Sequence, residues 1–182
     1  GKLLIADTCQ VYSETAVECA LSQAKENASE SESVSGNGTT RALTKMLKRG
    51  GTRFLTKPRS SDALAPLYEQ CPNFTEVLDS LRRQLELSFY GNEPFQFMPL
   101  LLAGDPGVGK THFALELAKA LGTVGHVLGM SSMTAGWVIA GSSSQWKDAR
   151  MGKLAQALVE GDYGNPLFIL DDAVVDGLVI TQ

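Results

Sequence analysis

The sequence predicts an α/β fold with a parallel sheet, preceded by a helical, partly flexible N-terminal region. Two observations lead to this prediction. The apolar run Pro99–Ala103 is followed by a glycine-rich stretch and then by the helical pattern Thr111–Leu121. A second apolar run, Leu167–Leu170, comes after another helical pattern, Arg150–Glu160. Strands that are apolar throughout and alternate with helices are typical of parallel sheets covered on both faces.

The composition and charge of the chain narrow the classes of function. Of its 182 residues, 43% are hydrophobic and 20% are charged, which is ordinary for a globular domain. A net charge of −4 gives no indication of a nucleic-acid-binding surface. No apolar run reaches the roughly 20 residues needed to cross a bilayer. Three widely spaced cysteines and two histidines form no zinc-binding pattern. We therefore expect a cytoplasmic protein with reduced thiols and no membrane or nucleic-acid partner.

The glycine-rich stretch GDPGVGKT, from Gly104 to Thr111, matches the P-loop pattern G-x-x-x-x-G-K-[ST]. Its glycines permit backbone angles that a Cβ would forbid, so that successive N–H groups can turn toward phosphate oxygens. Lys110 is expected to contact the β- and γ-phosphates, and the Thr111 hydroxyl to bind Mg²⁺. The residues expected to contact the nucleotide are Gly104, Asp105, Pro106, Gly107, Val108, Gly109, Lys110, Thr111 and His112.

The flanks of this pattern decide between two interpretations. A glycine/proline turn before an ordinary amphipathic helix would have the same composition. The order of strand, loop and helix, however, is the context that the P-loop requires. A helix that begins at residue 110 or 111 would also direct its positive end at bound phosphates. We therefore favour the phosphate-binding interpretation.

The apolar run Leu167–Leu170 ends in two acids, Asp171 and Asp172. A buried parallel strand delivers a carboxylate at its C-terminal end, where ligands of α/β sheets bind. Asp171 is expected to hold Mg²⁺ with Thr111, and Asp172 to stand where a base for the attacking water belongs. Such a run also fits a strand that stops at the surface. The presence of a P-loop lysine, Lys110, 61 residues before Asp171 (171 minus 110) favours the metal site over a strand that stops at the surface.

These motifs resemble those of the AAA+ ATPases, in particular bacterial ATPases related to the motor of the Lon protease. The resemblance rests on GDPGVGKTHFALELAKALG, WKDARMGKLAQAL and NPLFILDD and covers roughly residues 73–172, whereas residues 1–60 show none. It implies an α/β core in which Lys110, Thr111 and Asp171 hold Mg-ATP. It also implies that Trp146 stands where such motors carry a pore-lining aromatic that grips a threaded polypeptide. Packing of Trp146 against the core is the alternative.

Two departures from the family pattern bear on turnover. The family usually has Asp-Glu where this chain has Asp171-Asp172, and a carboxylate one methylene shorter lies about 1.5 Å further back. Misplacement by about 1 Å can cost roughly 100-fold in rate, so binding should survive better than hydrolysis. The family's sensor strand, arginine finger and helical lid have no counterpart in Ala173–Gln182. Within this stretch we expect Val174-Val175 and Leu178–Ile180 to pair with each other as short β segments.

The chain is expected to have three regions: a helical, partly flexible region over 1–60, a helical lead-in over 61–98, and a partial AAA+-type nucleotide-binding domain over 99–182. In the first region, Thr15–Ala28 has helical periodicity and 29–40 is expected to be a flexible linker, because it contains one apolar residue.

Further helices are expected on both sides of residue 60. Arg41–Lys48 predicts a short basic helix with a solvated charged face, in preference to a nucleic-acid contact. In the lead-in, Asp62–Tyr68 predicts a short helical turn, and Thr75–Tyr90 predicts a helix with one apolar stripe.

We expect Mg-ATP binding and, in the intact protein, AAA+-type ATP hydrolysis coupled to remodelling of a protein substrate, with Lys110 and Asp172 as catalytic residues. The expected partners are ATP or ADP, a protein substrate contacted by Trp146, and further copies of the chain, since intact relatives form rings.

A nucleotide-binding regulatory or interaction module without hydrolysis is the main alternative. A small P-loop kinase is disfavoured because no arginine-rich lid follows the acids, and a structural domain with an accidental P-loop would not be stabilised by nucleotide. An incomplete sheet would leave a strand edge exposed, which predicts self-association.

Overall fold

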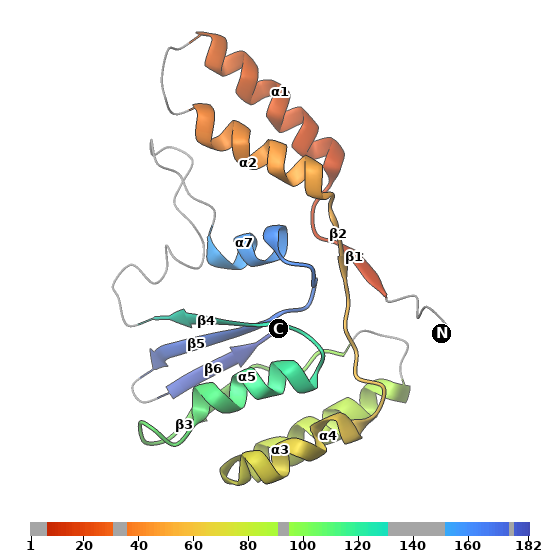
Figure 1. The fold of residues 1–182 in the computed structure, drawn as a ribbon, viewed down its shortest axis with the longest axis vertical. Helices are drawn as coiled ribbons and strands as arrows, with labels where there is room; N and C mark the ends of the chain where they lie inside the picture. The colour runs from red at the N-terminus through yellow and green to blue at the C-terminus, as the bar shows by residue number, and fades with distance from the viewer. Residues whose placement is uncertain (1–6, 31–35, 91–94, 131–151, 175–176) are drawn as a thin grey trace. The chain divides into compact units, whose positions relative to one another are not determined.

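The structure is a computed structural model, and it describes residues 7–30, 36–90, 95–130, 152–174 and 177–182 (Figure 1). The contacts divide the chain into two compact units. Unit 1 comprises residues 1–7, 55–135 and 165–182, and unit 2 comprises residues 8–54 and 136–164. The expected region boundaries at residues 60 and 98 stay predictions.

The described part of unit 2 consists of a short strand pair and helices. β1 and β2 pair antiparallel, with Cys9 opposite Arg53. Helices α1 and α2 lie side by side, and α7 contacts α2 (Figure 1). The elements are β1 (Thr8–Gln10), α1 (Glu14–Glu30), α2 (Gly36–Arg49), β2 (Thr52–Phe54) and α7 (Lys153–Glu160).

A buried arginine joins the parts of unit 2. The Arg53 side chain is 3% exposed and donates hydrogen bonds to the carbonyls of Leu158 and Val159 near the C-terminal end of α7. It also donates to the carbonyl of Gly50, directly after α2, at 2.8 Å, and to that of Thr52 at 2.7 Å. Because helix C-terminal carbonyls carry partial negative charge, they compensate the buried cation.

The expected linker over residues 29–40 is wrong where the structure describes it. Helix α1 continues to Glu30, and α2 begins at Gly36; residues 31–35 lie outside the described residues. The reason is tertiary packing: α1 and α2 contact each other, and such packing provides most of a helix's stability in proteins, whatever the local composition. The expected basic helix is confirmed within α2, and it ends before Gly50, whose φ is 73°.

Two charged residues of α2 pair with Glu160, the last residue of α7, and with Asp162, which follows the helix. The Lys45 ammonium lies 2.7 Å from a Glu160 carboxylate oxygen, and the Arg49 guanidinium lies 2.5 Å from the Asp162 carboxylate. The Lys45 side chain is 63% exposed. The charged face of α2 is thus open to solvent, as expected, but it also contributes ion pairs within unit 2.

Unit 1 begins with the helical lead-in and continues into the sheet. The helix expected over Thr75–Tyr90 is confirmed at both ends, and the turn expected near Pro66 is η1 followed by α3. The elements of the lead-in are η1 (Ser61–Leu64), α3 (Ala65–Gln70), η2 (Pro72–Phe74) and α4 (Thr75–Tyr90). The elements that follow are β3 (Leu100–Ala103), α5 (Lys110–Ala120), β4 (Gly125–Gly129), β5 (Leu167–Val174) and β6 (Gly177–Thr181).

The sheet of unit 1 is mixed, which corrects the expected parallel sheet. Its strand order is β3-β6-β5-β4, and only β4 and β5 pair in parallel. β6 pairs antiparallel with both β3 and β5. Two residues separate Val174 from Gly177, and so short a connection can join only antiparallel strands. The expected pairing of Val174-Val175 with Leu178–Ile180 is wrong: the chain reverses directly after Val174, so residues 178–180 run back along residues 169–171 of β5 and also pair with β3.

The direction of the other strands agrees with the expectation. Since β6 is antiparallel to both of its neighbours, β3 and β5 run in the same direction, and β4 runs with β5. The C-terminal ends of β3, β4 and β5 therefore lie at the same edge of the sheet. This arrangement brings the loop after β3 to the edge at which Asp171 lies.

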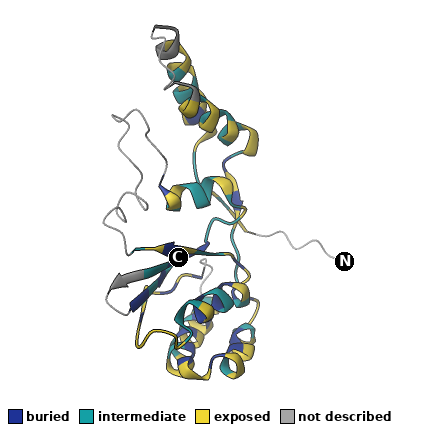
Figure 2. Cartoon of the chain, turned by 60° about the vertical axis from the view of Figure 1, so that its left-hand side comes forward, coloured by how far each residue is buried: buried dark blue, intermediate teal, exposed yellow. Residues whose placement is uncertain are grey.

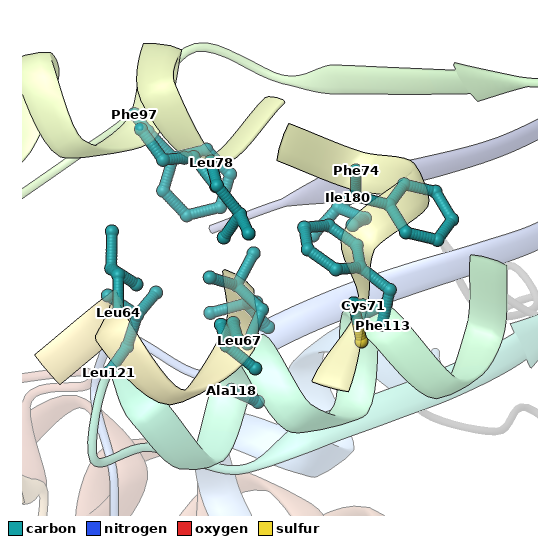
Figure 3. Close-up of a cluster of buried hydrophobic side chains, with 14 of the residues drawn as sticks. Leu64, Leu67, Cys71, Phe74, Leu78, Phe97, Phe113, Ala118, Leu121 and Ile180 are labelled. Carbon is teal, nitrogen blue, oxygen red and sulfur yellow. The ribbon is translucent and has the colours of Figure 1, made fainter. Parts of the chain in front are cut away.

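The core of unit 1 lies between the lead-in helices, α5 and one face of the sheet. The helices of this unit are buried on one side and exposed on the other (Figure 2). The rings of Phe74 and Phe113 stack with centroids 4.4 Å apart (Figure 3). Residues that are almost fully buried in this core include Leu64, Leu78, Leu81, Leu85, Phe95, Phe113, Leu117, Leu167, Ile169, Leu178 and Ile180.

Among the described residues, no helix combines the length and the apolar character that crossing a membrane requires. Cys9, Cys19 and Cys71 are free thiols, as the sequence predicted. Burial, with a smaller contribution from the negative charge of Glu116, raises the pKa of the Cys71 thiol.

Candidate functional site

The loop between β3 and α5 carries the P-loop pattern on the expected strand–loop–helix frame. Gly104, Gly107 and Gly109 have φ values of 149°, 85° and 93°, which L side chains rarely adopt. A Cβ at any of the three would meet no other atom within 4 Å. The backbone conformation of the loop, and not crowding, therefore accounts for glycine at these positions.

Helix α5 begins directly at the end of this loop. Its first backbone hydrogen bond is donated by the N–H of Phe113 to the carbonyl of Gly109 at 2.9 Å. The N–H groups of residues 110–112 precede this bond, and such groups at a helix start have no acceptor within the helix. Together with the helix dipole they favour an anion at this end of α5.

The Lys110 side chain folds back over the loop. Its ammonium donates hydrogen bonds to the carbonyl of Gly104 at 2.6 Å and to that of Asp105 at 3.1 Å. An ammonium has three donors, so these two bonds leave one for a further acceptor. The contact fixes a positive charge at the mouth of the loop, where a phosphate group would need it.

Thr111 and Asp171 meet although 60 residues separate them. The Thr111 hydroxyl lies 3.2 Å from a carboxylate oxygen of Asp171 and donates a hydrogen bond to it. Asp171 is held in β5 between neighbours on both sides, opposite Gly129 of β4 and Leu178 of β6. The sheet therefore fixes the carboxylate beside the first turn of α5.

The oxygen atoms of Thr111 and Asp171 suit a hard cation such as Mg²⁺. Mg²⁺ is usually held by one or two carboxylates together with phosphates and water, and not by a cage of protein ligands. In the part of the chain that the structure describes, no three His, Cys, Asp or Glu residues form a metal-binding group. The hydroxyl of Thr111 and the carboxylate of Asp171 are of the kind that holds Mg²⁺ together with phosphate and water.

The other predicted site residues fall into two groups. Asp105, Pro106, Val108 and His112 lie exposed in the loop and at the start of α5. The backbone of Asp172 belongs to β5, but its side chain is not among those described. Trp146, the predicted pore-lining residue, lies outside the described residues.

The aromatic stack beneath the site was missed by the sequence reasoning. Phe113, in the first turn of α5, is fully buried. Its partner Phe74 lies in η2, in the lead-in. The sequence between them gives no periodic signal for the contact, because it joins different elements 39 residues apart (113 minus 74). This stack ties the first turn of α5 to the lead-in.

The fold and this loop together define the class of protein domain. Unit 1 is an α/β domain with a mixed sheet, and it is consistent with a P-loop-like α/β fold. No family model matches the chain.

Two curated relatives match part of the chain. The Lon protease of Campylobacter concisus (strain 13826) is 32% identical over 93 residues, which are 51% of this chain and 12% of that protein. The Lon protease of Nitratidesulfovibrio vulgaris is 38% identical over 73 residues, which are 40% of this chain and 9% of that protein. The chain thus spans about a tenth of the length of these relatives. The partial similarity suggests a Lon-related origin.

Proposed function

We propose that the chain binds Mg-ATP, or ADP, at the loop formed by residues 104–111. The observation that carries the proposal is the 3.2 Å contact between the Thr111 hydroxyl and the Asp171 carboxylate at the start of α5. Two oxygen ligands meet there at the start of a helix whose first N–H groups have no acceptor within the helix, and the ammonium of Lys110 lies on the carbonyl of Gly104 in the same loop. An arrangement of this kind suits a phosphate group and its cation at one place.

Each residue has a separate role in the proposed site. The glycine-rich backbone would surround the phosphate oxygens, and Lys110 would exchange a carbonyl contact for the β- and γ-phosphates. Thr111 and Asp171 would hold the cation. When bound, Mg²⁺ neutralises charge that develops on the phosphates.

In the intact protein we propose ATP hydrolysis of the AAA+ type, coupled to remodelling of a protein substrate. The similarity to Lon proteases supports this proposal over the matched part of the chain. Lys110 and Asp172 would act in catalysis, by charge stabilisation and by activating water. A ring of copies and a protein substrate gripped through Trp146 belong to the same proposal.

A module that binds nucleotide without turning it over is the second candidate. Asp172 favours it, because its carboxylate is one methylene shorter than the glutamate usual in the family. Displacing a base by about 1 Å can cost roughly 100-fold in rate. In this case nucleotide would act as a regulatory ligand.

Titration with a fluorescent ATP analogue in Mg²⁺ tests the binding proposal. We expect saturable binding by the unmodified chain and its loss in Lys110→Ala. Lys119→Ala is the matched control, because Lys119 lies on the same helix and pairs only with Glu116 among the described residues. Equal binding by both variants would contradict the proposed site.

Phosphate release distinguishes the two candidates. If Asp172 occupies the position of the base, Asp172→Glu should raise the rate of phosphate release without tightening the binding of ATP. A substantial rate in the unmodified chain would rule out the module without turnover. Unchanged release in Asp172→Glu would contradict the role given to Asp172.

A further inference from the structure

Helix α7 lacks the features that usually stabilise a short helix. It has eight residues, and none of their side chains is buried. Gly152, which precedes the helix, provides no side-chain cap. Isolated helices shorter than about 12–15 residues are marginal in water, and in proteins the packing of an apolar face provides most of their stability. The helix therefore needs support from contacts other than a buried apolar face.

The charged residues of α7 are also placed against its dipole. Lys153 opens the helix and Glu160 ends it, and its first turn contains no acidic residue and its last turn no basic one. The N-terminal end of a helix carries partial positive charge and the C-terminal end partial negative charge, so both side chains are unfavourable where they stand. Cations that compensate the C-terminal end must therefore come from another part of the chain.

Such cations come from α2 and β2, which belong to the same unit as α7. The last four carbonyls of a helix have no partner within it. In α7, the carbonyl of Ala157 accepts a hydrogen bond from the N–H of Gly161 at 2.8 Å. The next two carbonyls accept hydrogen bonds from the buried guanidinium of Arg53. Arg49 donates to the carbonyl of Gly161, directly after the helix, at 3.1 Å. Two arginines from outside α7 thus hold its C-terminal end.

We propose that α7 is a conditional helix, which forms while Arg53, Arg49 and Lys45 hold its C-terminal end and opens locally when they do not. These three residues form the α7 clamp. Lys45 contributes by pairing with the Glu160 carboxylate at 2.7 Å, which offsets the unfavourable charge at the helix end. Arg49 pairs with the Asp162 carboxylate in addition to its carbonyl contact. Since both ion pairs are accessible to solvent, they weaken as the ionic strength rises. The clamp therefore makes the order of α7 depend on α2, on β2 and on salt.

Other contacts confine the opening to α7. The N–H of Phe54 donates to the carbonyl of Asp162 at 2.9 Å, and the N–H of Gly164 donates to the carbonyl of Phe54 at 2.8 Å. One residue further, the Asn165 side chain accepts a hydrogen bond from the N–H of Thr56 at 3.0 Å and donates one to its carbonyl at 2.8 Å. None of these bonds involves α7, so the chain between the helix and β5 stays in place when the helix opens. The proposal therefore stands or falls independently of nucleotide binding.

Hydrogen–deuterium exchange of the full chain, followed by mass spectrometry, tests the proposal because it measures local opening segment by segment. We expect the amides of residues 156–161 to exchange at least about tenfold faster in Arg53→Met, which loses both carbonyl contacts to a charged donor. In the double variant Lys45→Gln with Arg49→Gln we expect an increase of about fivefold, because exposed ion pairs contribute less. The amides of α5 and β5 should keep their rates in both variants. Raising the ionic strength to about 1 M should also speed the exchange of α7 in the unmodified chain.

Lys48→Gln is the matched control. Lys48 is an exposed cation of α2, and within the described residues it makes no hydrogen bond or ion pair, so its replacement should leave the exchange of α7 unchanged. Unchanged exchange over residues 156–161 in either test variant would overturn the proposal. Faster exchange of α2 together with α7 in the double variant would also overturn it, because the two helices would then open as one unit. The double variant alters only solvent-accessible side chains, and it keeps the test decisive should Arg53→Met fail to fold.

Discussion

Replacing Phe113 by alanine removes a ring that has no exposure to solvent and that stacks on Phe74 at a centroid distance of 4.4 Å. Truncation of a buried phenylalanine costs about 3–5 kcal/mol. A stacked aromatic pair contributes roughly 0.5–1.5 kcal/mol beyond the area that it buries, which argues against the lower end of that range. We therefore expect the free energy of unfolding to fall by about 4 kcal/mol.

Urea unfolding followed by circular dichroism measures this loss directly, and a thermal scan should show a melting temperature lower by roughly 8–16 °C. Phe54→Ala is the matched control, because the same ring is removed where it is 52% exposed. Because about half of the Phe54 residue is already exposed, Phe54→Ala should lower the free energy of unfolding by at most about half as much as Phe113→Ala. A loss in Phe113→Ala below about 1.5 kcal/mol, or equal to that of the control, would refute the argument that this stack anchors α5.

Two other predictions concern the two units separately. Arg53→Met leaves the carbonyls of Leu158 and Val159 without their donor. Because a buried unsatisfied group costs about 1–3 kcal/mol, the midpoint of thermal unfolding should fall by several degrees. An unchanged midpoint would contradict the role of Arg53. Burial lowers the pKa of His126 below its ordinary value of 6.5, so the unfolded chain binds the proton more readily. The stability linked to this group is present above about pH 6.5 and is lost as the pH falls through the folded-state pKa. His126→Phe should reduce the fall in the free energy of unfolding between about pH 7 and pH 5, and an unaltered pH profile would count against this assignment.

The sequence was informative where local signals are strong. The apolar stripe of α4 predicted the bounds of that helix, because its period matches the helical repeat. The glycine pattern predicted the loop at the start of α5, since only unusual backbone angles require glycine at residues 104, 107 and 109. Two acids at the end of an apolar run predicted the strand that brings Asp171 to Thr111.

The features that the sequence left unpredicted depend on contacts between distant segments. The orientation of β6 follows from its short connection to β5, and its insertion beside β3 is a long-range pairing without a local pattern. The contact of α7 with α2 likewise joins segments that are far apart in the sequence, and no local pattern marks it. Arg53 reads in the sequence as an ordinary surface cation, because its carbonyl partners in α7 lie about 100 residues away.

The central claim is that Thr111 and Asp171 form one cation site beside the phosphate-binding loop. Calorimetric titration of the full chain with ATP, with and without Mg²⁺, tests it most directly when unmodified protein is compared with Asp171→Asn. We predict that Mg²⁺ tightens ATP binding by the unmodified chain, and that Asp171→Asn loses this gain while still binding ATP without the metal. The same Mg²⁺-dependent gain in Asp171→Asn would contradict the claim.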